Sequence, residues 1–398
     1  MSDSTVEAVA SGARLLVVDD NEDNRYTLIL RLEIEGYQDI TTADDGQAAL
    51  ELLRTQPFDL VLLDVMMPNV DGYGVLEQLR TEGRLHNIPV IMISALNELD
   101  SVVRCIELGA VDYLSKPFDP VLLKARVGAS LEKKRLRDAV RAHLARIEEE
   151  LEAARQLQLS MVPSVFPPPT AQLPLEIFGM MEPAREVGGD LYDFYQADDG
   201  TLNFLIGDVS GKGVASALFM ARAKNGMRLV TRLFRRADGS APSPAEVVAT
   251  VNRELCRDNP EMMFVTLFFG RFDPRTRALR FTNAGHNPPY LLAGDVATPI
   301  TAAKGRPLGV RADSTFETGE LVLGPDEAIY LYTDGVTEAA NKKDELFTEA
   351  RLEAVLRETA GRPIKAIVDA VTDAVRSFAD GAPQSDDITA LAIRRVDV

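Results

Sequence analysis

The chain has 398 residues, 46% of them hydrophobic, which is enough for roughly two or three domains that each bury a core. The formal charge of -18 at pH 7 argues against a protein that binds the nucleic-acid backbone, because such binding depends on clustered Lys and Arg. Only Cys105 and Cys256 are present, which excludes a disulfide framework and a cysteine-based metal site and favours a reducing compartment.

The N-terminal residues are small, polar and acidic, without the apolar core of a signal peptide. No later stretch reaches the about 18 unbroken apolar residues that a membrane-spanning helix needs. We therefore expect a soluble, cytoplasmic protein with no membrane and no nucleic-acid partner.

Residues 12–130 alternate short apolar runs with amphipathic stretches. The runs at 15–18, 60–63 and 90–93 each end at an Asp or a Ser, and helical patterns cover 24–35 and 46–54. This alternation predicts an α/β domain with a doubly wound, parallel, five-stranded sheet.

Residues 131–162 are rich in Glu, Arg, Lys, Ala and Leu and lack Gly and Pro, which predicts one long helical linker. One face carries a heptad seam with a polar interruption at Gln158. The seam consists of Val140, Leu144, Ile147, Leu151, Ala154, Gln158 and Met161. It favours a parallel coiled-coil homodimer, and the alternative is a connector that lies on its own domains.

Residues 170–398 mix apolar strands at 202–206, 265–270, 328–332 and 389–393 with helical patterns at 215–234 and 244–257. Several strands follow one another without a helical crossover. This order predicts an α+β domain with antiparallel sheets.

Carboxylates end the first strands of the N-terminal domain. Asp19 and Asp20 close one predicted strand and Asp64 closes another, and the carboxyl ends of parallel strands meet at one edge of a sheet. Three crowded carboxylates suit Mg2+, which binds oxygen ligands at about 2.0–2.1 Å. Ser94 and Lys116 end or follow further strands, so both are expected to bind phosphate oxygens at this edge.

These positions, together with Lys116-Pro117-Phe118, resemble the signature of CheY-like receiver domains. The resemblance implies that Asp64 is the phosphoacceptor, that Asp20 binds Mg2+ directly and Asp19 indirectly, and that the Met66 carbonyl completes the site. It also implies a switch pair, Ser94 and Tyr113, and a cis Lys116-Pro117 bond. Phosphorylation would add about -1.5 to -2 charges, toward which Ser94 moves while Tyr113 turns inward.

The C-terminal domain has a second set of aspartates, each at the start or end of an apolar strand. They are Asp190 and Asp193 in Gly-Gly-Asp-Leu-Tyr-Asp, Asp208 in Gly-Asp-Val-Ser-Gly, Asp334 in Tyr-Thr-Asp-Gly, and Asp386 and Asp387 before Ile388. Such a set suits two divalent cations about 3.5–4 Å apart, which activate a water for attack on phosphate without a protein nucleophile. A single Asp-Gly pair would indicate only a turn.

With Asn-Ala-Gly-His-Asn-Pro-Pro at 283–289, these motifs occur in the order found in metal-dependent protein phosphatases (PPM). The likeness is to the SpoIIE-like branch that includes RsbU. It implies a β-sandwich flanked by helices, with two Mn2+ or Mg2+ ions.

The resemblance assigns roles position by position. The expected metal ligands are Asp190, Asp208, the Val209 carbonyl, Asp334, Asp386 and Asp387, the last as a ligand or as a partner of one. Arg185 stands at the spacing of a phosphate-binding arginine. Asp193 is expected to be structural, and His286 to be a loop histidine rather than a proton relay.

A receiver, a helical linker and a PPM domain on one chain resemble stress-response regulators that act by partner switching. This likeness implies a sensor histidine kinase as the phosphodonor and a phosphorylated STAS-type anti-sigma-factor antagonist as the substrate. Receiver phosphorylation would alter the linker helix, and helices near residues 211–219 would complete the metal site. A non-catalytic adaptor would have lost metal ligands that this chain retains, and a transcription factor would need a basic recognition helix.

Overall fold

The computed structural model describes residues 12–95, 99–185, 187–234, 237 and 239–397. The chain forms two compact units that divide between Ile147 and Glu148. Each unit is described by itself below. No helix in the described part of the chain is long and apolar enough to cross a lipid bilayer.

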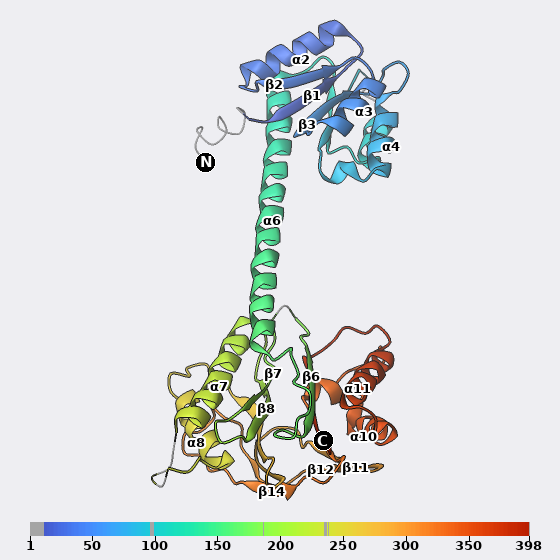
Figure 1. The fold of residues 1–398 in the computed structure, drawn as a ribbon. Coiled ribbons are helices and arrows are strands. Elements are labelled where there is room, and N and C mark those ends of the chain that lie inside the picture. Colours follow the sequence, from blue (N-terminus) through green and yellow to red (C-terminus); the bar gives the residue numbers. More distant parts are fainter. Residues whose placement is uncertain (1–11, 96–98, 186, 235–236, 238, 398) are drawn as a thin grey trace. The chain divides into compact units, whose positions relative to one another are not determined.

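The N-terminal unit contains a five-stranded parallel sheet with helices on both faces (Figure 1). The strands follow the order β2-β1-β3-β4-β5, as expected for a doubly wound sheet. They are β1 (Arg14–Val18), β2 (Asp39–Ala43), β3 (Leu60–Asp64), β4 (Val90–Ser94) and β5 (Asp112–Ser115). The helices are α2 (Glu22–Ile34), α3 (Gly46–Thr55), α4 (Gly72–Thr81), η1 (Arg84–His86), α5 (Leu99–Glu107) and the start of α6 (Pro120–Met161).

Side chains of the sheet alternate between two apolar cores. Leu16 and Leu63 pack with α3 and α4 on one face, whereas Leu15 and Leu62 pack with α2 and the start of α6 on the other. Both faces of β3 and β4 are fully buried, which explains why their sequences read as unbroken apolar runs.

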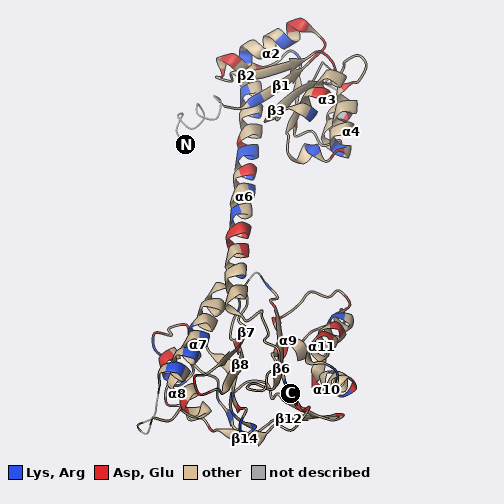
Figure 2. Cartoon of the chain, in the orientation of Figure 1, with Lys and Arg blue, Asp and Glu red and all other residues tan. Residues whose placement is uncertain are grey.

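Helix α6 begins at Pro120 rather than at residue 131, so the predicted start of the linker helix was wrong. The Asp119 carboxylate accepts hydrogen bonds from the amides of Val121 and Leu122, and proline suits the first turn of a helix. No proline follows until Pro163, so nothing ends the last helix of the receiver before it becomes the linker. Figure 2 shows Lys, Arg, Asp and Glu distributed along its length.

The heptad seam of α6 divides into two parts. The apolar side chains of Val140, Leu144 and Ile147 are exposed to solvent. Gln158, which we predicted to be a polar position of the seam, is only 4% exposed. Its side chain is hydrogen bonded to the Gly188 carbonyl, within the C-terminal unit. The seam is therefore exposed in its first part and again at Met161, with the buried Gln158 between them.

The C-terminal unit is a sandwich of two mostly antiparallel sheets with helices on both outer faces (Figure 1). One sheet has the order β13-β10-β9-β8-β7, with β14 also paired to β10, and the other has the order β12-β11-β15-β16-β6. The first comprises β7 (Leu191–Gln196), β8 (Leu202–Val209), β9 (Val265–Asp273), β10 (Ala278–Ala284), β13 (Lys304–Gly305) and β14 (Gly319–Val322). The second comprises β6 (Leu175–Glu182), β11 (Tyr290–Ala293), β12 (Val296–Pro299), β15 (Ala328–Tyr332) and β16 (Ile388–Arg395).

Three apolar layers hold the sandwich together. Phe204, Phe268 and Leu391 belong to the core between the two sheets. Helices α7 (Val214–Leu233) and α8 (Pro244–Leu255) cover the first sheet, and α10 (Thr348–Thr359) and α11 (Ile364–Ala379) cover the second. The short helix α9 (Asp334–Thr337) follows β15 directly. This confirms the predicted β-sandwich flanked by helices.

Candidate functional sites

The receiver carboxylates meet at one edge of the parallel sheet. Asp19 follows β1 and Asp64 ends β3, and both side chains are buried, whereas Asp20 is exposed. One oxygen from each of the three carboxylates lies within 4.8 Å of the other two. This spacing is compatible with one small divalent cation held by oxygen ligands.

Lys116 supplies the positive charge of this cluster. Its Nζ atom lies 2.6 Å from Oδ2 of Asp19 and 3.0 Å from Oδ1 of Asp64. Burial raises the pKa of Asp64, an effect that Lys116 opposes and that Asp19 and Asp20 strengthen. The carboxylates are thus crowded enough to gain from a cation, and Lys116 already meets part of that need.

The remaining predicted receiver residues surround the same edge. Ser94 ends β4 and is buried, Tyr113 lies on β5 and is partly buried, and the peptide bond between Lys116 and Pro117 is cis, as predicted. Met66 lies two residues after Asp64, the last residue of β3, and its side chain is exposed.

The carboxylates of the C-terminal unit converge from four segments of the chain. Asp208 lies near the end of β8, Asp190 directly precedes β7, Asp334 begins α9, and Asp386 precedes β16. Strands β15 and β16 are paired, which brings the last two close together, and β7 pairs with β8, which does the same for the first two. The sandwich thus gathers at one site residues that are far apart in the sequence.

The pKa shifts reveal how strongly these carboxylates interact. Burial, together with repulsion from Asp334, Asp386 and Asp387, raises the pKa of Asp208 to about 7, an effect that a hydrogen bond with Asp190 opposes. Burial and the charges of Asp208 and Asp387 raise the pKa of Asp190 well above its usual value. Divalent cations relieve this kind of crowding.

Asp190 is held by Thr333, a residue that the sequence analysis did not single out. The Thr333 hydroxyl donates a hydrogen bond of 2.7 Å to Oδ2 of Asp190 and accepts one of 3.1 Å from the Thr389 amide. Thr333 is fully buried and precedes Asp334 in the Tyr-Thr-Asp-Gly motif, so its position in that motif was the available signal.

The carboxylate of Asp387 accepts hydrogen bonds from backbone amides. Its Oδ1 accepts a hydrogen bond of 2.8 Å from the Ala184 amide, and its Oδ2 accepts one of 2.7 Å from the Gly189 amide. A Cβ atom at Gly188 would overlap this carboxylate, which explains the glycine there. Of the two roles left open by the sequence, this geometry favours that of a residue that positions the ligands.

Asp386 has two partners in the structure. Its Oδ2 lies 3.0 Å from Nζ of Lys212, and its Oδ1 accepts a hydrogen bond of 2.9 Å from the Asp387 amide. Lys212 lies in the loop between β8 and α7, within the Gly-Asp-Val-Ser-Gly-Lys-Gly motif, and was not predicted to contact a site residue. Its ammonium group occupies the place that a metal ion bound by this carboxylate would compete for.

The donor set of the C-terminal site fits divalent cations in its chemistry, because it consists of carboxylates whose raised pKa values reflect mutual repulsion. It is less compact than the receiver site. Among the described residues, only the receiver triad brings three carboxylate oxygens within 4.8 Å of one another. Pairs of aspartates in the C-terminal site accordingly suit two separate ions better than one shared by three close carboxylates.

Two further predicted residues lie at this site. The Val209 carbonyl faces the loop that precedes Asp190, since a Cβ atom at Gly189 would lie 2.6 Å from it. Arg185 is exposed and follows Ala184, whose amide is bonded to Asp387. The exposed guanidinium therefore extends from a segment that is fixed next to the carboxylates.

His286 is a buried residue of the loop between β10 and β11. It is 3% exposed, and its Nδ1 atom lies 2.9 Å from the Thr266 hydroxyl, while its backbone pairs with the Asn283 side chain. Burial lowers its pKa to about 4, which an interaction with the Tyr332 backbone only partly opposes. A buried, neutral imidazole is not suited to proton exchange with solvent.

Asp193, which we predicted to be structural, is paired with two cations of α7. Its fully buried carboxylate lies 3.2 Å from Nζ of Lys224 and accepts two hydrogen bonds, of 2.5 and 2.7 Å, from Arg228. This cluster fixes β7 to α7, away from the metal-site carboxylates.

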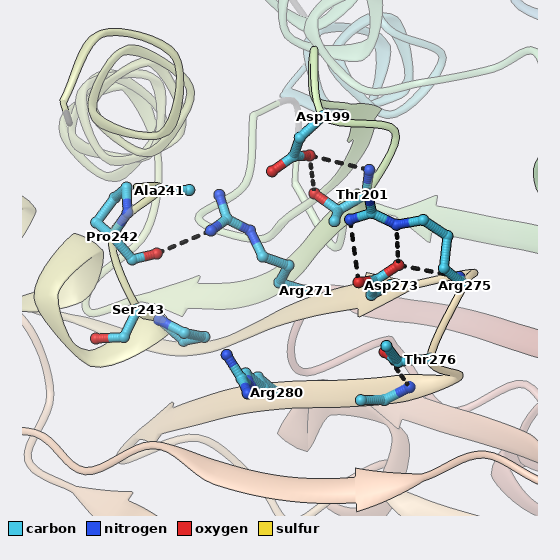
Figure 3. Close-up of a pocket in the computed structure, with 12 residues that line it drawn as sticks. Asp199, Thr201, Ala241, Pro242, Ser243, Arg271, Asp273, Arg275, Thr276 and Arg280 are labelled. Carbon is cyan, nitrogen blue, oxygen red and sulfur yellow. Dashed lines mark hydrogen bonds and ion pairs between the residues drawn. The ribbon is translucent and has the colours of Figure 1, made fainter. Parts of the chain in front are cut away.

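An arginine-lined cavity of about 250 Å³ lies between the β9–β10 hairpin and the start of α8 (Figure 3). Each arginine already has an oxygen partner. Arg271 donates to the Pro242 carbonyl, Arg275 pairs with Asp273 as Figure 3 shows, and Arg280 pairs with Glu320 at 2.9 Å. These contacts satisfy the arginines within the protein, and we assign no ligand to the cavity.

Comparison with known proteins identifies both units. Residues 15–128 match the family described as "Response regulator receiver domain", and residues 198–396 match "Stage II sporulation protein E (SpoIIE)". The second match begins after Asp190, so it covers Asp208, Asp334, Asp386 and Asp387 only.

Two relatives illustrate these matches. "Protein IcfG" of Synechocystis sp. is 33% identical over 267 residues, which is 62% of this chain and 41% of that protein. "Probable transcriptional regulator ycf27" of Cyanidium caldarium is 44% identical over 125 residues, 31% of this chain and 49% of that protein. The chain thus spans less than half of the length of either relative.

The SiaA-PP2C domain of Pseudomonas aeruginosa has a similar fold. It aligns with a TM-score of 0.54 and 22% identity, over 64% of this chain and 98% of that domain. The family match covers half of the sequence, and the fold agrees with it. The chain therefore belongs to the family described as "Stage II sporulation protein E (SpoIIE)", with a PP2C-like fold in that part, and carries a response regulator receiver domain ahead of it.

Proposed function

We propose that this protein is a response regulator in which phosphorylation of Asp64 controls a metal-dependent serine/threonine protein phosphatase. The observation that carries the proposal is the convergence of Asp190, Asp208, Asp334 and Asp386 from four segments, with burial and mutual repulsion raising the pKa values of the first three. A fold that only bound partners would gain nothing from concentrating buried negative charge at a cost to its stability.

In the receiver, we assign Asp19, Asp20, Asp64 and the Met66 carbonyl to a Mg2+ site. An Asp64 oxygen forms a bond to the phosphorus of a phosphohistidine on a sensor kinase, the P–N bond breaks, and the imidazole leaves with the kinase. The Lys116 ammonium, 3.0 Å from Asp64, stabilises the charge of the phosphoryl oxygens. Ser94 and Tyr113 are the switch residues that respond to the new phosphate.

In the phosphatase domain, we assign Asp190, Asp208, the Val209 carbonyl, Asp334 and Asp386 to two Mn2+ or Mg2+ ions. Bound ions of this kind supply a water of lowered pKa and neutralise phosphate charge. Thr333 orients Asp190, and the Asp387 carboxylate fixes the loop that carries it. The exposed Arg185 guanidinium is available to bind the phosphate oxygens of the substrate.

The substrate that we propose is a phosphoserine or phosphothreonine on a small STAS-type anti-sigma-factor antagonist of a stress response. The SpoIIE family match supports this choice. A cytoplasmic location follows from the same proposal.

Coupling is proposed to run through α6. Its exposed seam of Val140, Leu144 and Ile147 suits a parallel homodimer, since each of the three is at least 39% exposed. The expected test is sedimentation of the full chain, in which Leu144→Asp converts a dimer to a monomer. A monomeric unaltered chain at micromolar concentration would contradict the dimer.

The direct test of the function is hydrolysis of a generic phosphate ester and of candidate phosphoproteins by the full chain, with and without acetyl phosphate. We expect turnover that requires Mn2+ or Mg2+, that is lost in Asp208→Ala, and that changes on receiver phosphorylation. Metal-independent turnover, or equal turnover by Asp208→Ala, would overturn the assignment. No turnover under any condition, with binding of a regulatory protein retained, would favour the non-catalytic adaptor.

A further inference from the structure

The C-terminal end of α6 is hydrogen bonded to the loop that carries Asp190. Nε2 of Gln158 donates a bond of 2.6 Å to the Gly188 carbonyl, and the Gly188 amide donates one of 2.9 Å to Oε1 of Gln158. One side-chain amide thus satisfies both backbone groups of a single glycine. Gln158 is only 4% exposed, so water does not compete for these bonds.

Gly188 is the first link to the metal-site carboxylates. It lies against the Asp387 carboxylate, which accepts a bond of 2.7 Å from the next residue, Gly189. Asp190 follows, and its own side chain is bonded to Thr333. The loop from Gly188 to Asp190 is therefore held from two sides, by Asp387 and by Gln158.

The helix end that carries Gln158 is itself fixed to the domain. Val162 belongs to the core between the sheets, and the Tyr192 hydroxyl donates a bond of 2.5 Å to the Pro163 carbonyl. Gln158 therefore projects from a firm support. A side chain on such a support can define where a loop lies, whereas one on a loose segment would follow the loop.

We propose that Gln158 is a positioning residue that sets the place of the Gly188–Asp190 loop and thereby presents Asp190 to the cation site. This inference rests on the proposed function for the role of Asp190. It also explains the polar interruption in the heptad pattern, because Gln158 serves the phosphatase domain and not a helix–helix interface.

The test compares three variants of the full chain. Gln158→Leu removes both bonds to Gly188, and Gln158→Glu keeps the size and the acceptor but loses the donor. Gln156→Leu is the matched control, because Gln156 is exposed on the same helix and bonds only the Glu152 side chain, at 2.8 Å. Two readouts are used: the part of the Mn2+ binding that Asp208→Ala abolishes, measured by titration calorimetry so that the receiver site is left out, and hydrogen exchange of the backbone amides of residues 187–191.

We expect Gln158→Leu to weaken Mn2+ binding by roughly ten- to a hundredfold, which is the usual effect of losing a residue that orients a metal ligand. Amide exchange in 187–191 should rise in the same variant, and Gln158→Glu should fall between it and the unaltered chain. Gln156→Leu should match the unaltered chain in both readouts, and labelling of Asp64 should be equal in all.

The outcomes separate the two proposals. If the unaltered chain binds no more Mn2+ than Asp208→Ala does, the proposed function fails, and the exchange data alone decide whether Gln158 positions the loop. If the unaltered chain binds Mn2+ and both Gln158 variants bind it equally well with unchanged exchange, the positioning role is wrong while the proposed function stands. Should Gln158→Leu not fold, the isosteric Gln158→Glu decides on the same two readouts.

Discussion

Thr333 donates a hydrogen bond of 2.7 Å to Asp190, although 143 positions separate the two residues in the sequence. The donor and the acceptor come from different sheets of the sandwich, Thr333 after β15 and Asp190 before β7. The bond thus joins the two layers at the site where the carboxylates meet. Thr333 is 0% and Asp190 2% exposed, so water does not compete for this hydrogen bond, which strengthens it.

Removing the Thr333 hydroxyl should weaken metal binding. Thr333→Val keeps the shape of the side chain, but it leaves a buried carboxylate oxygen and the Thr389 amide without their partner. We expect Mn2+ affinity and kcat to fall by about tenfold or more. Calorimetry and steady-state assays measure both, and Thr333→Ser, which retains the hydroxyl, should stay close to the unaltered chain. Equal affinities for the Val and Ser variants would contradict this role.

Asp64→Asn should abolish labelling of the chain by a radioactive acetyl phosphate donor, because the amide cannot act as the nucleophile. The suitable control is Asp39→Asn, since Asp39 is exposed and pairs only at 3.5 Å with Arg14. Labelling followed on a gel should persist in the control. Persistent labelling of Asp64→Asn itself would show that another residue accepts the phosphoryl group.

Lys212→Met should tighten Mn2+ binding. The Lys212 ammonium lies 3.0 Å from Asp386 and competes with a cation for that carboxylate. Removing this charge should raise the affinity by roughly tenfold, since interactions between charges at such distances amount to about 1–4 kcal/mol in partly exposed sites. Calorimetry at low and high salt measures the change, and Lys342→Met, which alters a pair with Asp380, is the control. A weaker affinity in Lys212→Met would mean that Lys212 supports the site instead.

His286 should make the phosphatase domain less stable in mild acid. Burial lowers its pKa from 6.5 to about 4, so the unfolded chain binds a proton in this interval that the folded chain does not. The contribution of neutral His286 to the free energy of unfolding is fully present above pH 6.5 and is lost progressively as the pH falls toward 4. At pH 5 the free energy of unfolding should be lower by about 2 kcal/mol than above pH 6.5. Urea unfolding at pH 7.5 and 5 measures it, and His286→Asn should remove this part of the pH dependence. An unchanged difference between the two pH values in the variant would refute it.

The placement of Asp19, Asp64 and Ser94 at one edge of the receiver sheet could be predicted from the sequence, because they end or follow strands whose order and direction follow from the pattern. The sequence also located the aspartates of the phosphatase domain. It did not predict the contacts of Lys212 or Gln158. These depend on partners far along the chain, and a polar residue on a helix looks the same in a sequence whether water or a glycine backbone satisfies it.

The start of α6 escaped prediction for a different reason. A change in composition near residue 131 suggested a boundary, but helices end at breakers and caps rather than at changes in composition. The different hydrogen-bond partners of Asp386 and Asp387 could not be predicted from the sequence either. The two are neighbours in the sequence, and only the structure shows that the backbone amides of Ala184 and Gly189 donate hydrogen bonds to Asp387.

The hydrogen bonds of Asp387 also bear on the order in which the domain becomes competent during synthesis. The amides that it binds belong to residues 184 and 189, which leave the ribosome 203 and 198 residues before it. The Asp190 loop therefore lacks one of its two supports until nearly the whole phosphatase domain has been translated. A chain that stalls before β16 would contain Asp190 and Asp208 but would lack Asp387, which fixes the loop before Asp190, so unfinished copies should lack the activity that we propose.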